Sequence, residues 1–252
     1  PLHFFRPDTA PDRFTTLDQR QHLFAQAGAD AMLVFGFDAA LASLPARAVA
    51  QQRLVGLIGA GGVAAGADFT CGKGRDGDVA VLRALGEELG FGVDTVAPVA
   101  ESGDVISSSL IREALQAGKP REAAALLTRP FAIQGVVEPG AKLGRELGYP
   151  TANLSLGNYL RPRYGIYAVR GHLPDGRVLD GAANLGIRRS FDPPVELLEP
   201  YFFDFSGDLY GQTIEVELIE FIRDEAKFDS LEALKAQIAA DCEAAKAALR
   251  IS

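Results

Sequence analysis

The sequence predicts an α/β region followed by an all-β region that a C-terminal helix closes or covers. Two patterns predict this fold class. Residues 1–128 alternate short apolar runs with amphipathic segments, whereas residues from Phe131 onward are apolar runs joined by turn residues. Alternating strands and helices are typical of a parallel, Rossmann-like sheet, and consecutive strands favour an antiparallel barrel. We therefore expect two domains, 1–128 and 129–252.

Apolar spacing and stop signals place the elements of the first region. The segment 16–27 has apolar residues at helical intervals and stops at Gly28, and the segment 79–89 stops in the same way at Gly90. Further helices are expected at 46–58, 108–117 and 121–127. A buried strand is expected at 31–35, and short strands at 63–65 and 91–96.

The second region has strand and turn signals and ends in a helix. Strands are expected at 165–173 and 177–185, which flank the turn Pro174-Asp175-Gly176, and at 198–205 and 213–222. Asp229 and Glu232 have the spacing of a capping box. An apolar stripe at helical spacing follows, formed by Leu231, Leu234, Ile238, Cys242, Ala245 and Leu249.

Composition excludes several classes of protein. The chain has 252 residues, of which 48% are hydrophobic, and its net charge of −8 argues against a nucleic-acid or anionic-membrane partner. Its two cysteines, Cys71 and Cys242, have neither disulfide-framework nor zinc-site spacing. Without a membrane-length apolar run or a signal peptide, a cytoplasmic location is expected. The oligomeric state leaves no signal in the sequence.

A glycine-rich run at 135–154 predicts a site for phosphate and metal. Glycines at 135, 140, 144 and 148 accompany Lys142 and Arg145, and Pro150-Thr151-Ala152-Asn153 follows. Glycines let a loop approach a polyphosphate closely. Strand alternation puts Thr151 and Asn153 on one face, where neutral oxygens suit Mg²⁺. A glycine-rich turn, closed by the same two side chains, explains the spacing equally well.

The run as a whole resembles the flavokinase motif of riboflavin kinases, in particular the C-terminal module of bacterial bifunctional riboflavin kinase/FMN adenylyltransferases (FAD synthetases). The resemblance continues through 199–211, similar to E-x-x-x-x-D-F-x-x-D-L-Y-G, through 184–188, similar to N-x-G-x-R, and through 222–228, similar to I-R-x-E-x-K-F. It covers essentially all of 129–249.

This resemblance implies a six-stranded antiparallel barrel that transfers the γ-phosphate of MgATP to the 5′-hydroxyl of riboflavin. It implies Glu199 as general base and Thr151 and Asn153 as ligands of Mg²⁺ and phosphate. The ATP site implied by the motif comprises Gly140, Lys142, Gly144, Gly148, Thr151 and Asn153. Arg223 and Phe228 are candidate flavin contacts, although a surface arginine and a core phenylalanine are the alternative.

The first region resembles part of the FMN adenylyltransferase module, a Rossmann-like nucleotidyltransferase domain. The loop 66–75, which contains Asp68, is similar to G-x-D-F-x-F-G-x-x-R, and 106–112 is similar to I-S-S-T-x-I-R. The latter supplies Ser107, Ser108, Ser109 and Arg112 at a helix N-terminus, which suits an anion. The family's H-x-G-H motif has no counterpart here. We therefore expect a partial domain that does not make FAD competently, and an N-terminal segment omitted from the sequence.

The sequence thus favours a riboflavin kinase with ATP as co-substrate, Mg²⁺ as cofactor, and FMN or FAD as product. A fully bifunctional FAD synthetase is the first alternative. A non-catalytic regulator that binds flavin or nucleotide is the second. Riboflavin and ATP are the expected partners.

Overall fold

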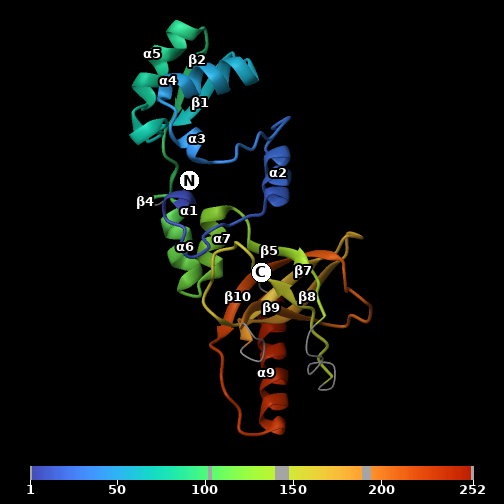
Figure 1. Cartoon of the computed structure of the whole chain (residues 1–252). Helices are drawn as coiled ribbons and strands as arrows, with labels where there is room; N and C mark the ends of the chain where they lie inside the picture. The colour runs from blue at the N-terminus through green and yellow to red at the C-terminus, as the bar shows by residue number, and fades with distance from the viewer. Residues whose placement is uncertain (1, 102–103, 140–147, 189–193, 251–252) are drawn as a thin grey trace. The chain divides into compact units, whose positions relative to one another are not determined.

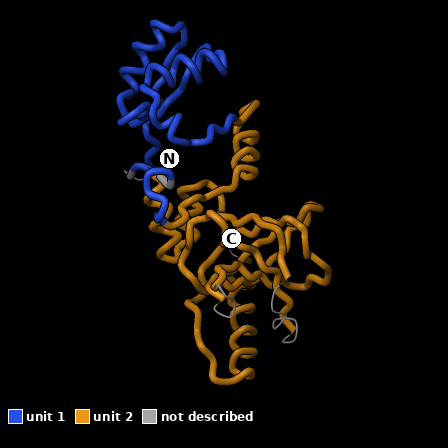
Figure 2. Tube along the Cα trace, viewed as in Figure 1, with its two compact units in different colours: residues 1–9, 33–106 blue, residues 10–32, 107–252 orange. Residues whose placement is uncertain are grey.

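A computed structural model describes residues 2–101, 104–139, 148–188 and 194–250. The chain folds into two compact units, Pro1–Thr9 with Leu33–Ile106, and Ala10–Met32 with Ser107–Ser252 (Figure 2). The second unit therefore includes segments that precede residue 129. The division into functional modules 1–128 and 129–252 stays a prediction, because compactness does not test it.

The first unit contains a parallel strand pair with helices. Strands β1 (Gly62–Gly66) and β2 (Gly92–Val96) pair in parallel, as expected from strand–helix alternation. Helix α5 (Val79–Leu89) connects them and ends at Gly90, whose φ of 85° is left-handed. The remaining elements are α1 (Leu2–Phe5), α3 (Ala39–Ala42), α4 (Ala46–Val49), the π-helical η1 (Ala50–Ile58), η2 (Lys73–Arg75), β3 (Ala100–Glu101) and β4 (Asp104–Val105).

The strand expected at 31–35 does not form. Within the described ranges this segment has no strand assignment, and Leu33 and Val34 are 59% and 57% exposed. An apolar run becomes a buried strand only when a neighbouring strand satisfies its backbone, and the described residues provide none beside it. The prediction was therefore wrong for this segment.

The second unit is built around a nearly closed antiparallel barrel (Figure 1). In the described ranges its strands are β5 (Phe131–Val136), β6 (Leu154–Ser155), β7 (Gly165–His172), β8 (Val178–Arg188), β9 (Val195–Phe202) and β10 (Thr213–Arg223). They follow the order β5-β10-β7-β8-β9-β6, and each neighbouring pair is antiparallel. The outer strands approach each other, since a Cβ at Gly135 would lie 3.6 Å from the Leu154 side chain. The expected six-stranded barrel is confirmed.

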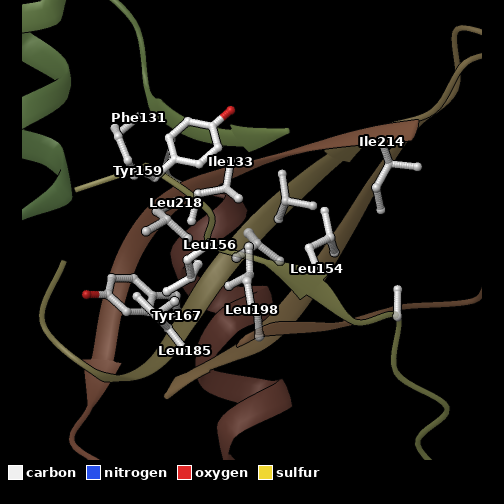
Figure 3. Packing of buried hydrophobic residues seen from close by; sticks show 14 of the residues in the cluster. Phe131, Ile133, Leu154, Leu156, Tyr159, Tyr167, Leu185, Leu198, Ile214 and Leu218 are labelled. Carbon is white, nitrogen blue, oxygen red and sulfur yellow. The ribbon is translucent and has the colours of Figure 1, made fainter. Parts of the chain in front are cut away.

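Apolar side chains fill the barrel and set the orientation of its strands. Leu154, Leu185 and Leu198 point into the interior and are fully buried (Figure 3). Leu198 is the register partner of both Leu154 and Leu185. Because side chains alternate along a strand, the residues next to these leucines face outward.

Helix α9 (Leu231–Arg250) packs on the outer face of the barrel. Its Cys242, Ala245 and Leu249 are buried, whereas Leu231, in the first turn, is 49% exposed. The expected cap at Asp229 was misplaced by one residue. The Ala233 N–H donates to Ser230 Oγ at 3.1 Å, because Ser230 directly precedes the first helical residue.

Helices α2 (Leu17–Gln26), α6 (Ser108–Gln116) and α7 (Pro120–Leu127) complete the second unit. Gln19 of α2 is 6% exposed and donates to Glu215 Oε2 on β10 at 2.6 Å. The Tyr159 hydroxyl donates to Gln19 Oε1, also at 2.6 Å. Buried hydrogen bonds therefore hold α2 on the barrel. Among the described helices, none is both long and apolar enough to span a membrane.

Candidate active site

Three polar residues lie side by side on β8, on β9 and directly before β6. Asn184 is the register partner of Glu199. On the other side, Leu154 pairs with Leu198, and one further step of this register places Asn153 opposite Glu199. All three share the outward face, because their neighbours in each strand point into the core. Asn153, Glu199 and Asn184 therefore form a polar row.

Glu199, at the centre of the polar row, is a buried carboxylate with polar partners. The residue is 8% exposed. Asn184 Nδ2 donates to its Oε2 at 3.4 Å, and Arg188 Nη2 lies 2.5 Å from the same oxygen. A buried carboxylate needs such partners, because desolvation otherwise disfavours its charge. Its position beside two amides suits a group that accepts a proton from a bound hydroxyl.

Asn153 is held in place from the neighbouring chain segment. It is 5% exposed, and its backbone carbonyl accepts a hydrogen bond from the Glu138 N–H at 2.9 Å. Its side-chain Nδ2 donates to the Glu138 carbonyl at 3.4 Å. This orientation turns the amide oxygen away from Glu138, and the half-buried Thr151 lies two residues earlier. Neutral amide and hydroxyl oxygens beside a carboxylate fit the preference of Mg²⁺ for hard ligands.

The proposed phosphate loop is described only at its end. Gly140, Lys142 and Gly144 lie outside the described residues. Gly148 has φ of 88°, which a side chain would strain, and no atom of the described residues lies within 4 Å of the position that a Cβ would take. The backbone there is open to close approach by a ligand.

Arg223, the last residue of β10, and Phe228 lie near each other. The Arg223 guanidinium is 5.8 Å from the Phe228 ring and forms two hydrogen bonds with Asp241 of α9, at 2.8 and 2.7 Å. This pair fastens α9 to the barrel. The expected flavin contacts stay a prediction, and the structure gives Arg223 a definite structural partner.

The serine and arginine positions of the adenylyltransferase resemblance fall in different compact units from Asp68. Asp68 belongs to the first unit, whereas Ser107, Ser108, Ser109 and Arg112 belong to the second. The Leu110 N–H donates to Ser107 Oγ at 3.3 Å, so Ser107 caps α6. Ser108 and Arg112 line a pocket of about 390 Å³ together with Arg13, Arg20 and Arg129. Its arginines favour an anion, which is the chemistry expected at these positions.

Two members of the site, Asn184 and Arg188, were not predicted. Both occur in the segment 184–188, whose resemblance to the family is clear, but the sequence gives neither a role. Their pairing with Glu199 depends on the register of β8 and β9. A period-two pattern shows which residues share a face of one strand, but it does not show which residues of another strand lie opposite.

The sequence that forms the barrel matches a known family of proteins. The riboflavin kinase family model matches residues 127–249, and the FAD synthetase family model matches residues 1–110. These two matches define the class of protein: a chain that combines a riboflavin kinase region with an FAD synthetase region.

Full-length relatives narrow the assignment. Bifunctional riboflavin kinase/FMN adenylyltransferase of Haemophilus influenzae is 38% identical over 98% of this chain and 80% of its own length. The protein of the same description from Escherichia coli K12 is 39% identical over 96% of this chain and 77% of its own length. The chain belongs to the bifunctional riboflavin kinase/FMN adenylyltransferase family.

A solved structure shares the fold over most of the chain. A crystal structure described as a macrolide-efflux protein from Streptococcus pneumoniae aligns with a TM-score of 0.82 and 30% identity. The alignment covers 94% of this chain and 78% of that one.

Proposed function

We propose that this protein is an ATP:riboflavin 5′-phosphotransferase that produces FMN. The observation that carries the proposal is the buried Glu199 carboxylate between Asn153 and Asn184, on the outer face of a barrel in a riboflavin kinase family. The reaction requires a base and neutral oxygen ligands from the protein, because phosphoryl transfer depends mainly on positioning and charge neutralisation.

In the proposed reaction, Glu199 accepts the proton of the riboflavin 5′-hydroxyl. The hydroxyl oxygen forms a bond to the γ-phosphorus as the bond from that phosphorus to the β,γ-bridging oxygen breaks. FMN and ADP are the products, and the proton ends on Glu199 before it passes to solvent. The amide of Asn184 holds the carboxylate in place, which keeps its oxygen oriented toward the hydroxyl.

Thr151 and Asn153 would hold Mg²⁺, which would neutralise phosphate charge when bound. The amide orientation of Asn153 supports this assignment, since its nitrogen is committed to the Glu138 carbonyl. The open backbone at Gly148 supports the approach of ATP phosphates, with Gly140, Lys142 and Gly144 as the remaining cradle. Arg223 and Phe228 are proposed to border the flavin.

The test is FMN formation from riboflavin and MgATP, followed by HPLC. Glu199→Gln is expected to lower kcat by about 10²–10⁴-fold with a modest effect on riboflavin affinity, because only proton transfer is lost. Thr151→Ala is expected to abolish Mg²⁺-dependent use of ATP. Glu220→Gln is the matched control, since Glu220 is also a barrel glutamate paired with an arginine, Arg121. Near-native turnover of Glu199→Gln would rule out its role as base.

A second activity, transfer of AMP to FMN, is supported by the FAD synthetase match over 1–110 and by the bifunctional relatives. The arginine-lined pocket beside Ser108 and Arg112 suits an anion. The same HPLC run separates the possibilities. FMN alone indicates a kinase, FMN with FAD a bifunctional enzyme, and no product a non-catalytic binding protein.

A further inference from the structure

Arg188 lies directly on the proposed base. Its Nη2 is 2.5 Å from Glu199 Oε2, yet its side chain is 46% exposed whereas that of Glu199 is 9% exposed. We propose that Arg188 is a further catalytic residue, which leaves Glu199 during the reaction and binds the phosphoryl group in transfer. This inference rests on the proposed kinase function.

The strand geometry explains how Arg188 reaches the carboxylate. Glu199 of β9 lies opposite Asn184 of β8. Arg188 is four residues after Asn184 and therefore lies on the same face of β8. That separation is roughly 13 Å along the strand, which two extended side chains can bridge. Gly186 is the residue between them on this face, and it has no side chain to block the guanidinium. Glycine at 186 therefore leaves Arg188 a clear path to Glu199.

A second carboxylate occupies the space above Gly186. A Cβ placed on Gly186 would collide with the Glu225 carboxylate. Glu225 and Glu199 therefore share this face of β8 and β9, where their negative charge opposes the approach of ATP phosphates. The Arg188 guanidinium contacts Glu199 and compensates part of the negative charge of the two carboxylates. A site built to receive a polyphosphate needs such compensation.

Proton transfer to Glu199 weakens the ion pair that holds Arg188. While Glu199 is charged, it attracts the guanidinium. Once the carboxylate has accepted the hydroxyl proton, that attraction is lost at the stage when negative charge is greatest on the phosphoryl oxygens. A planar guanidinium suits those oxygens, because it can donate two parallel hydrogen bonds.

The distance to be covered is short. The attacking hydroxyl must lie about 3 Å from the base, and its oxygen about 3–3.5 Å from phosphorus. The phosphorus therefore lies within roughly 9 Å of Arg188 Nη2 in its observed position. An exposed arginine side chain covers this distance by rotation about its side-chain bonds, without movement of the strand.

Kinetics of three single variants test the inference. Arg188→Ala should lower kcat for FMN formation by about 10²–10³-fold and change the KM for riboflavin by less than about threefold, since transition-state charge alone loses its partner. Arg188→Lys should recover part of the loss, and millimolar guanidinium should raise the turnover of Arg188→Ala. Arg177→Ala removes an exposed arginine that pairs with Asp175 in the hairpin turn, and serves as the unaffected control.

A double variant separates a role on phosphate from a role on Glu199 alone. If Arg188 binds the phosphoryl group, Arg188→Ala should lower kcat about tenfold or more even in the Glu199→Gln background. No further loss in that background, or single-variant turnover equal to that of Arg177→Ala, would overturn the inference and leave the kinase proposal intact. A parent chain that forms no FMN would overturn both. Circular dichroism of each variant verifies folding before rates are compared.

Discussion

Replacement of Arg223 by methionine tests whether the Arg223–Asp241 pair anchors α9. Asp241 is 5% exposed and accepts hydrogen bonds from Arg223 Nε and Nη2 at 2.8 and 2.7 Å. Gln237 Nε2 donates to the same carboxylate at 2.9 Å. In Arg223→Met the charge of Asp241 stays buried, and Gln237 remains as its known partner.

The expected loss of stability follows from the buried charge of Asp241, which loses its cation and keeps only the hydrogen bond from Gln237 as a known contact. A buried carboxylate that loses its cation costs about 3–5 kcal/mol, and the remaining Gln237 bond favours the lower end, about 3 kcal/mol. Asp241→Asn should cost about 1 kcal/mol, because the freed Arg223 side chain is already 24% exposed and can be hydrated. The pair Arg223→Met with Asp241→Leu should recover about 2 kcal/mol of the single-variant loss, since no buried charge remains.

Urea unfolding followed by far-UV circular dichroism measures these differences in the free energy of unfolding. Hydrogen exchange of α9 peptides localises them, and protection should fall first in 231–250. An Arg223→Met protein within about 0.5 kcal/mol of the parent would refute the reasoning.

Flavin binding separates the two roles considered for Arg223. Loss of riboflavin affinity in Arg223→Met but not in Asp241→Asn would support the flavin contact. Equal losses in both variants would assign Arg223 to the anchor alone.

Three further outcomes follow from the packing and the ionisable groups of the described residues. Gly171→Ala should lower the free energy of unfolding by about 1–3 kcal/mol, because its Cβ would collide with the buried Phe202 ring; an unchanged urea midpoint would contradict this. Burial raises the pKa of Tyr159 to about 12, so above about pH 10 the unfolded state releases this proton first and stability falls by about 2 kcal/mol toward pH 12. Tyr159→Phe should flatten that alkaline decline in urea titrations, and an equally steep decline would show that another group causes it. Burial raises the pKa of the Cys242 thiol to about 11. Native Cys242 should therefore react with iodoacetamide at least about tenfold more slowly than the half-buried Cys71. Peptide mass mapping measures the two rates. Equal rates would mean that the α9 face opens readily.

Local signals predicted the helices and the hairpin well. The α5 bounds agree with the expected 79–89, and α2 begins after Thr16, whose side chain accepts a hydrogen bond from the Gln19 N–H. The turn at 174–176 joins β7 and β8 as expected, with Gly176 at φ of 86°. These features are encoded within a few residues, because caps and turns satisfy their own backbone groups.

Features that depend on distant partners were missed. The segment 31–35 has the composition of a strand but lacks a described neighbour to pair with. Gln19 looks like an ordinary polar helix residue, yet it bonds Glu215 almost two hundred positions away. Neither outcome could be read from local propensity, because each depends on which surface the rest of the chain presents.

The residues of the site could not all be predicted, because the sequence does not show the register between neighbouring strands. Glu199 and Asn153 were predicted as functional residues from the resemblance, and the structure brings them together, whereas Asn184 and Arg188 join them only through the pairing of β8 with β9. A shift of β9 by one residue would turn Glu199 into the barrel and Leu198 toward solvent.

The leucine interior opposes such a shift. Leu154, Leu185 and Leu198 are each 0% exposed, so moving Leu198 outward would lose about 1.5–3 kcal/mol of side-chain burial and place a carboxylate among the other two. The same packing that closes the barrel therefore aligns Asn153, Glu199 and Asn184 on its outside. The polar row of the proposed active site is thus a consequence of the apolar row behind it.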